Sequence, residues 1–134
     1  MKALLQIAAA LATLQYFAHA LLFLRAKPSH GREEADLVER MKGQRWNFSG
    51  FTRSYWDFYF GYGLLAILWG IVEVIILWQL VSLANDGSVS VRPVVATLLG
   101  ANIAHAALTL RYFFLQPVLF DLLIAIVLAL ALFE

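Results

Sequence analysis

The sequence predicts an all-α integral membrane protein, a four-helix bundle with a long cytoplasmic loop between its first and second helices. Of its 134 residues, 62% are hydrophobic and only 14% are charged. A soluble domain of this size keeps a larger charged surface, so the low charge content indicates that lipid is the solvent. The apolar residues also gather into four long segments. We expect these segments to form a single transmembrane domain over residues 1–134.

The four apolar segments are the predicted membrane spans. About 20 apolar residues cross the hydrocarbon core as a helix, so the first three segments are long enough and the fourth is near the lower limit. Helices are the expected form because a spanning segment must satisfy its own backbone hydrogen bonds. The first segment also resembles a signal peptide, with Ala-His-Ala ending at Ala20, but we expect it to be retained. The spans cover residues 3–24, 54–82, 93–112 and 118–133.

The connections differ in character. Residues 32–43 are predicted to form an amphipathic helix on the membrane surface, because Ala35, Val38 and Met41 recur at helical spacing under a mixed-charge face. A solvated loop is the alternative. The stretch Ala-Asn-Asp-Gly-Ser at 84–88 predicts a turn between the second and third spans.

The placement of basic residues predicts the orientation. Eight of the ten Lys and Arg residues fall in the connections after the first and third spans, which share one side of the membrane. The positive-inside rule puts these connections in the cytoplasm and both termini outside. A net charge of +1 argues against a nucleic-acid partner, and the absence of cysteine excludes thiolate chemistry. The eight residues are Arg25, Lys27, Arg32, Arg40, Lys42, Arg45, Arg53 and Arg111.

An aromatic run opens the second span. Six of the nine positions from Tyr55 to Gly63 are aromatic, Trp56 among them, which is typical of the layer where a helix meets lipid headgroups. Arg53 and Asp57 have the i, i+4 spacing that allows an ion pair on one helix face. An ionised carboxylate inside the membrane is costly, so Asp57 is expected to need a partner from another helix.

Each predicted span carries polar side chains at a similar depth in its cytoplasmic half. His19 and His105 each precede an arginine by six residues, which places them roughly 9 Å inside. By the same count Asp57 and Asp121 lie roughly 6 Å inside, and Gln15 and Asn102 lie about a turn deeper than the histidines. Intramembrane polar groups normally face one another in the bundle. We therefore predict a polar layer that includes residues from all four spans.

Glu73 is predicted to stand apart from that layer. It lies toward the outer end of the second span, and Arg92 at the start of the third is its expected ionic partner. The second span is longer than one bilayer crossing, which allows Glu73 to lie near the interface. The prediction is a structural pair rather than part of a functional site.

The polar layer is consistent with three functions. The first is a pocket for a small hydrophobic or lipid-like ligand, with or without acid–base chemistry of an isomerase kind. The second is a structural or accessory role in a larger membrane complex or homo-oligomer. The third is haem binding through His19 and His105; no metal site is predicted. The first is preferred, whether the protein is an enzyme is left open, and the predicted ligand-binding residues are Gln15, His19, Arg53, Trp56, Asp57, Asn102, His105 and Asp121.

Several motifs carry a resemblance. The stretches TRSYWDFYFGYGLL, ILWQL and RYFFLQP, between Trp46 and Pro117, resemble a group of small, uncharacterised four-span bacterial membrane proteins. The resemblance implies a bacterial inner membrane and brings no activity with it. The stretch YFAH in the first span and the Arg-Pro before the third are also similar to the emopamil-binding (EXPERA) class of sterol-binding and isomerase proteins. That class carries acidic residues in its first two helices, and this sequence has no match for them. The resemblance therefore implies only that a lipid-like ligand is favoured over haem.

Overall fold

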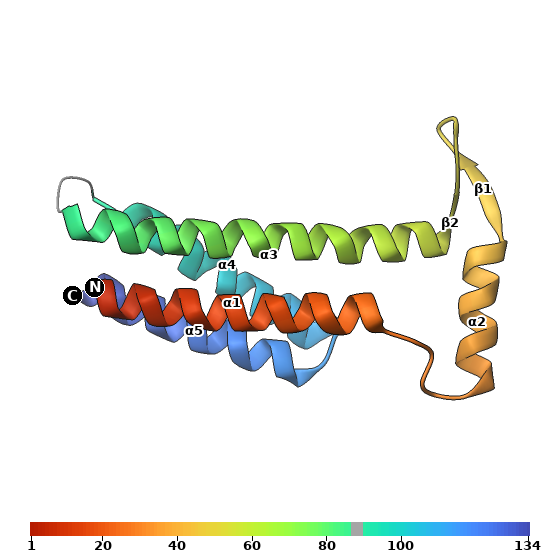
Figure 1. The fold of residues 1–134 in the computed structure, drawn as a ribbon, viewed down its shortest axis with the longest axis horizontal. Helices are drawn as coiled ribbons and strands as arrows, with labels where there is room; N and C mark the ends of the chain where they lie inside the picture. Colours follow the sequence, from red (N-terminus) through yellow and green to blue (C-terminus); the bar gives the residue numbers. More distant parts are fainter. Residues whose placement is uncertain (87–89) are drawn as a thin grey trace. The chain divides into compact units, whose positions relative to one another are not determined.

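Five helices and one β-hairpin make up the described chain, which covers residues 1–86 and 90–134 of the computed structural model (Figure 1). Four of the helices in these residues are long and apolar enough to cross a membrane, which confirms the predicted four-helix membrane fold. The β-hairpin was not predicted from the sequence. In chain order the elements are α1 (Lys2–Arg25), α2 (Arg32–Gly43), β1 (Arg45–Phe48), β2 (Phe51–Ser54), α3 (Tyr55–Asp86), α4 (Arg92–Tyr112) and α5 (Leu115–Phe133).

The helix bounds follow the predicted spans with two differences. The fourth span begins earlier than expected, at Leu115, because Pro117 is accommodated within the first turn of α5. The second span is longer, since α3 continues to Asp86, within the predicted turn at 84–88. Residues 87 and 88 of that turn lie outside the described residues. Residues Arg32–Gly43 form the predicted helix, α2, with the predicted bounds.

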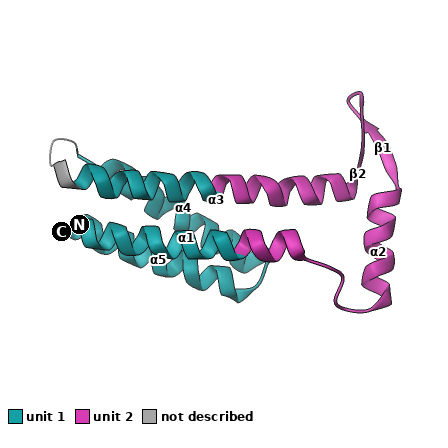
Figure 2. Ribbon diagram, in the orientation of Figure 1, with its two compact units in different colours: residues 1–18, 70–134 teal, residues 19–69 magenta. Residues whose placement is uncertain are grey.

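The chain divides into two compact units, each described on its own (Figure 2). Unit 1 contains residues 1–18 and 70–134, and so holds most of α1, the second half of α3, and all of α4 and α5. Unit 2 contains residues 19–69, with the end of α1, α2, the hairpin and the first half of α3.

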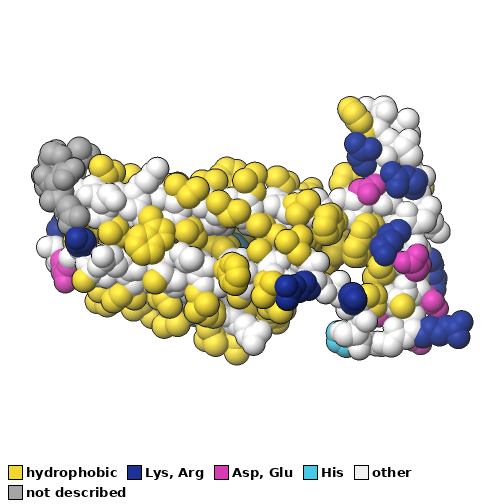
Figure 3. All heavy atoms as spheres, in the orientation of Figure 1, with side chains coloured by type: hydrophobic (Ala, Val, Ile, Leu, Met, Phe, Trp, Pro, Cys, Tyr) yellow, Lys and Arg dark blue, Asp and Glu magenta, His cyan; other side chains and the backbone are white. Residues whose placement is uncertain are grey.

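Unit 1 has an apolar core that favours close helix packing. Ala8, Ala9 and Ala12 are fully buried on α1, and such small side chains let neighbouring helices approach closely. α4 packs along α5. Larger side chains fill the space between the helices, while many others remain exposed on the outer surface, as expected where lipid is the solvent (Figure 3). The larger buried residues are Leu5, Leu77, Leu80, Val95, Leu98, Ile124 and Leu128.

Unit 2 contains the hairpin, which the sequence analysis missed by expecting only a loop after the surface helix. The strands are antiparallel, with Phe48 paired to Phe51 across a two-residue turn. Ser49 and Gly50 in this turn have φ of 53° and 91°, which is the left-handed backbone of a type I′ hairpin turn. The Asn47 side chain closes the turn by accepting the Gly50 N–H at 2.8 Å.

Gly70 on α3 is a close-approach position in unit 1. A Cβ at this residue would overlap the ring of Tyr16 on α1, whereas a Cβ at Gly100 on α4 would meet open space. Gly70 is therefore required by packing, and Gly100 is not.

We predict that Gly70→Ala destabilises the protein and Gly100→Ala does not. The first substitution overpacks the α1–α3 contact, which should lower the free energy of unfolding by about 1–3 kcal/mol. The second is expected to be neutral or stabilising by up to about 1 kcal/mol, because alanine favours helix more than glycine. Unfolding of the purified variants in detergent measures both. Equal effects of the two substitutions would contradict this packing.

Candidate functional site

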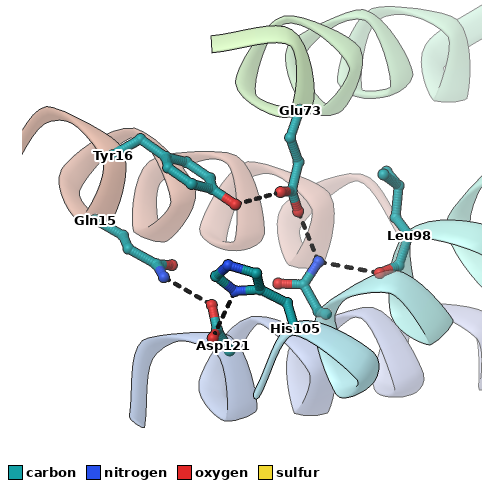
Figure 4. Close-up of polar contacts among 7 residues, drawn as sticks. Gln15, Tyr16, Glu73, Leu98, His105 and Asp121 are labelled. Atoms are coloured by element: carbon teal, nitrogen blue, oxygen red, sulfur yellow. Dashed lines mark hydrogen bonds and ion pairs between the residues drawn. The ribbon is translucent and has the colours of Figure 1, made fainter. Parts of the chain in front are cut away.

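Unit 1 holds a set of six polar side chains that join all four of its helices, and we call this set the polar cluster (Figure 4). Two of its members are carboxylates, Glu73 on α3 and Asp121 on α5. Each carboxylate accepts hydrogen bonds from one side chain of α1 and one of α4. The cluster consists of Gln15, Tyr16, Glu73, Asn102, His105 and Asp121.

Glu73 is held by two neutral donors. The Tyr16 hydroxyl donates to Glu73 Oε2 at 2.7 Å, and Asn102 Nδ2 donates to Glu73 Oε1 at 2.6 Å. Asn102 Nδ2 also donates to the Leu98 carbonyl at 3.0 Å, so both of its N–H groups are used and its amide orientation is set. Glu73 is therefore held by side chains of α1 and α4, and neither of these two partners is a cation.

The predicted pairing of Glu73 with Arg92 is wrong. Arg92 begins α4 and Asn102 lies ten residues further on, about 15 Å along the helix. Glu73 is at the level of Asn102, in the middle of α4. The prediction failed because α3 continues to Asp86, beyond the predicted end of the span, so Glu73 lies further from the end of the helix than expected.

Asp121 is the most buried member of the cluster, with no exposed side-chain surface. Gln15 Nε2 donates to its Oδ1 at 2.7 Å, and His105 Nδ1 lies 2.8 Å from its Oδ2. The His105 side chain is 51% exposed, so this pair connects a buried carboxylate to the surface of the unit. Gln15 itself is 7% exposed, and its Oε1 is a buried acceptor with no hydrogen-bond donor.

The spacing of the donors explains the geometry. Gln15 and Tyr16 are neighbours on α1, and consecutive helical side chains point about 100° apart, so one residue reaches α5 and the other α3. On α4, Asn102 and His105 are three residues apart and share a face. Two helices thus provide the donors and the other two provide the acceptors.

The polar cluster contains half of the predicted site residues. The structure brings together Gln15, Asn102, His105 and Asp121, and it adds Tyr16 and Glu73, which the prediction left out. Glu73 had a usable signal, since it is an acidic residue in a long apolar run whose next Lys or Arg in the chain is Arg92. Tyr16 had no usable signal, because the sequence alone does not distinguish a buried tyrosine from one at the membrane interface.

The other predicted site residues belong to unit 2. His19 stacks on Phe23 with ring centroids 6.0 Å apart. Asp57 caps α3: Ser54 N–H donates to Asp57 Oδ2 at 2.8 Å, and Asp57 N–H donates to Ser54 Oγ at 3.1 Å. This reciprocal pair is a capping box with aspartate in the usual place of glutamate. The charge of Asp57 is thereby satisfied locally.

Arg45, not Arg53, forms the ion pair with Asp57, at 3.3 Å between Nη2 and Oδ2. The predicted i, i+4 pair on one helix face is wrong because Arg53 lies on β2, outside the helix. Its guanidinium donates to the Thr52 carbonyl at 2.9 Å and lies over the Phe51 ring.

Trp56 lines a cavity of about 350 Å³ in unit 2, which we call the interfacial cavity. Lys27 and Glu34 add opposite charges to its wall. The backbone N–H groups of His30 and Ser29 donate to Glu34 and hold the pKa of its carboxyl below the ordinary value. The apolar wall includes Phe23, Leu24, Val38, Met41, Trp56, Tyr59 and Phe60.

Comparison with known proteins gives no match to a protein-family model, a curated protein or a solved structure. The two family resemblances of the sequence therefore remain predictions. Within residues 1–86 and 90–134, no three His, Asp or Glu side chains are grouped so as to hold a metal ion.

We predict that Tyr16→Phe destabilises unit 1 while retaining its packing. The ring stays against Gly70, but Glu73 loses one of its two donors, which should lower the free energy of unfolding by about 1–2 kcal/mol. The matched control is Tyr62→Phe, since Tyr62 is 70% exposed on α3. Unfolding in detergent measures both, and a Tyr16→Phe protein as stable as the control would show that this hydrogen bond contributes nothing.

Proposed function

We propose that this protein binds a single amphiphilic, lipid-like molecule in the interfacial cavity of unit 2, from the cytoplasmic side of a bacterial inner membrane. The observation on which the proposal depends is the cavity itself, with its apolar wall and a lysine at its edge. Its volume of about 350 Å³ is at the lower end of the range for small-molecule sites.

The cavity wall favours a hydrocarbon chain. Val38 and Met41 on α2 are half-buried, and aromatic rings of α1 and α3 form another part of the wall. The rings are packed on one another, with Phe23 and Phe60 centroids 5.4 Å apart and Trp56 and Tyr59 centroids 5.4 Å apart. Such a wall offers apolar surface and few hydrogen bonds, so affinity comes from excluding water.

The charge around the cavity favours an anionic headgroup. Residues 25–53 carry seven Lys and Arg against four Asp and Glu, a basic excess of three. Basic residues next to a membrane attract anionic lipids by about 1 kcal/mol each. Lys27 is the basic residue at the cavity wall, and the Glu34 carboxylate on the same wall accepts hydrogen bonds from Ser29 and His30.

This location differs from the predicted one. The sequence analysis placed the ligand in the polar layer, but there the side chains bind one another. The interfacial cavity and a second, more open hollow beside Asp57 and Tyr62 both lie in unit 2. Of the predicted ligand-binding residues, Trp56 lines the proposed site.

We predict that the full chain, released from nanodiscs containing phosphatidylglycerol and phosphatidylcholine, retains one phosphatidylglycerol molecule. Native mass spectrometry measures the bound lipid. Met41→Trp fills the cavity and is expected to reduce retention at least fivefold. The matched control Leu37→Trp adds the same ring at an exposed position of the same helix and should not. Equal retention by the two variants would contradict the cavity as the site.

The headgroup preference is tested separately by Lys27→Gln. Removal of one basic residue is expected to reduce the preference for phosphatidylglycerol over phosphatidylcholine about fivefold, which corresponds to about 1 kcal/mol. The control is Arg32→Gln, which removes the same charge from a side chain that is 93% exposed on α2. A similar loss in both variants would mean that the attraction is general to the surface.

The proposed orientation has its own test, since the chain has no cysteine and accepts single labelling sites. Ser29→Cys lies in the basic connection and Ser90→Cys between α3 and α4. In intact cells a membrane-impermeant maleimide should label Ser90→Cys only, and in inverted vesicles Ser29→Cys only. The opposite pattern would reverse the orientation that the basic residues predict.

A further inference from the structure

The β-hairpin of unit 2 has two faces of different chemistry. Alternate residues of a strand share a face, and residues paired across the strands lie side by side. The register therefore places three aromatic rings and one arginine on one face, which we call the apolar face: Trp46, Phe48, Phe51 and Arg53. The opposite face carries only polar side chains, those of Arg45, Asn47, Thr52 and Ser54.

The protein covers the apolar face only in part. The Phe48 ring meets the Phe58 ring of α3 edge to face, with centroids 4.9 Å apart, and the Trp46 ring meets the Tyr55 ring at 5.1 Å. Phe51 remains 64% exposed. A two-stranded hairpin is marginally stable in water by itself, so an arrangement that leaves its aromatic face open to water is unfavourable.

The neighbouring surface of α3 indicates what covers this face. Phe58, Tyr62 and Leu65 follow one another at i, i+4 and i+7, so they share a side of the helix, and all three are exposed. They belong to a span that begins at Tyr55, so this side of α3 contacts lipid. The contact of Phe48 with Phe58 makes the apolar face continuous with it. Since the hairpin extends sideways from the start of α3 (Figure 1), it lies along the membrane surface.

Arg53 adds a positive charge to the apolar face. Its guanidinium lies 5.5 Å from the centre of the Phe51 ring and donates to the Thr52 carbonyl at 2.9 Å. Among the residues that the structure describes, no carboxylate forms an ion pair with Arg53, since the nearby Asp57 is paired with Arg45. The planar guanidinium has further N–H groups in a geometry that matches phosphate oxygens. Aromatic rings beside an arginine suit the layer where acyl chains meet phosphates.

From this arrangement we infer that the hairpin is a membrane-docking element, whose apolar face lies in the headgroup layer of the surrounding phospholipid bilayer and whose Arg53 binds a lipid phosphate. The polar face, with Asn47 and Thr52, is turned toward water. This contact involves the lipids around the protein and not a molecule held in the interfacial cavity, so it does not depend on the proposed function.

Spin labels on adjacent residues test the docking. Phe51→Cys places a label on the apolar face and Thr52→Cys places one on the polar face, and both positions are exposed, so neither label requires repacking. In vesicles of phosphatidylcholine, electron paramagnetic resonance measures collisions with oxygen, which concentrates in lipid, and with a water-soluble nickel chelate. The ratio of oxygen to nickel collisions should be severalfold higher at residue 51 than at residue 52. Phosphatidylglycerol vesicles should give the same pattern, because both lipids carry the phosphate.

Two results would overturn the docking. Equal access of the nickel chelate to both labels would place the whole hairpin in water. A label at residue 51 that neither reagent reaches would show that protein, such as a second copy of the chain, covers the apolar face.

The phosphate contact has its own variant. Arg53→Gln, introduced with the label at residue 51, should lower the ratio of oxygen to nickel collisions, because the hairpin loses a charge that holds it at the surface. The matched control Arg32→Gln removes a charge from α2, where the side chain is 93% exposed, and should leave the ratio unchanged. An equal ratio in the two variants would contradict the role of Arg53.

Discussion

The structure of unit 1 depends on the cost of placing two carboxyl groups where lipid surrounds the helices. Hydrocarbon offers them no hydrogen bonds, so every donor must come from the protein. Glu73 and Asp121 find their donors on α1 and α4, and each donor reaches its carboxylate only at one helical position. A shift of α1 by one residue would remove both Gln15 and Tyr16 from their acceptors. The polar cluster therefore sets the register of four helices at one level.

The apolar contacts alone would not set that register. Lipid chains are as apolar as leucine, so helices gain little from burying Leu77 or Leu128 against one another in a membrane. Small residues contribute by allowing close approach instead. At Gly70 the absence of a side chain admits the Tyr16 ring, and that same ring carries the hydroxyl that binds Glu73. Close packing and hydrogen bonding therefore depend on each other at this point of the α1–α3 contact.

The features that could be predicted from the sequence are those that depend on segment length and helical periodicity. The four spans, the surface helix at 32–43 and a shared depth for His105 and Asp121 could all be obtained by counting residues. The hairpin was missed because a Ser-Gly turn between two short strands is a weak signal beside an aromatic belt. Glu73 was assigned to Arg92 because the second span was expected to end at residue 82, whereas α3 continues to Asp86 and Glu73 lies at the level of Asn102. Which acceptor each donor binds depends on tertiary packing, which a single sequence does not show.

Asp57 and Glu73 show how position along one helix decides what a carboxylate can do. Asp57 is in the first turn of α3, where it accepts a backbone N–H, pairs with Arg45 and lies at the positive end of the helix dipole. These interactions compensate its negative charge at the end of the helix. Glu73 is in the interior of the same helix, where the backbone N–H groups are used within the helix and its donors are neutral side chains. Glu73 therefore depends on the side chains of Tyr16 and Asn102 for its hydrogen bonds, and so on the packing of α1 and α4, whereas Asp57 is satisfied by residues next to it in the chain and by Arg45.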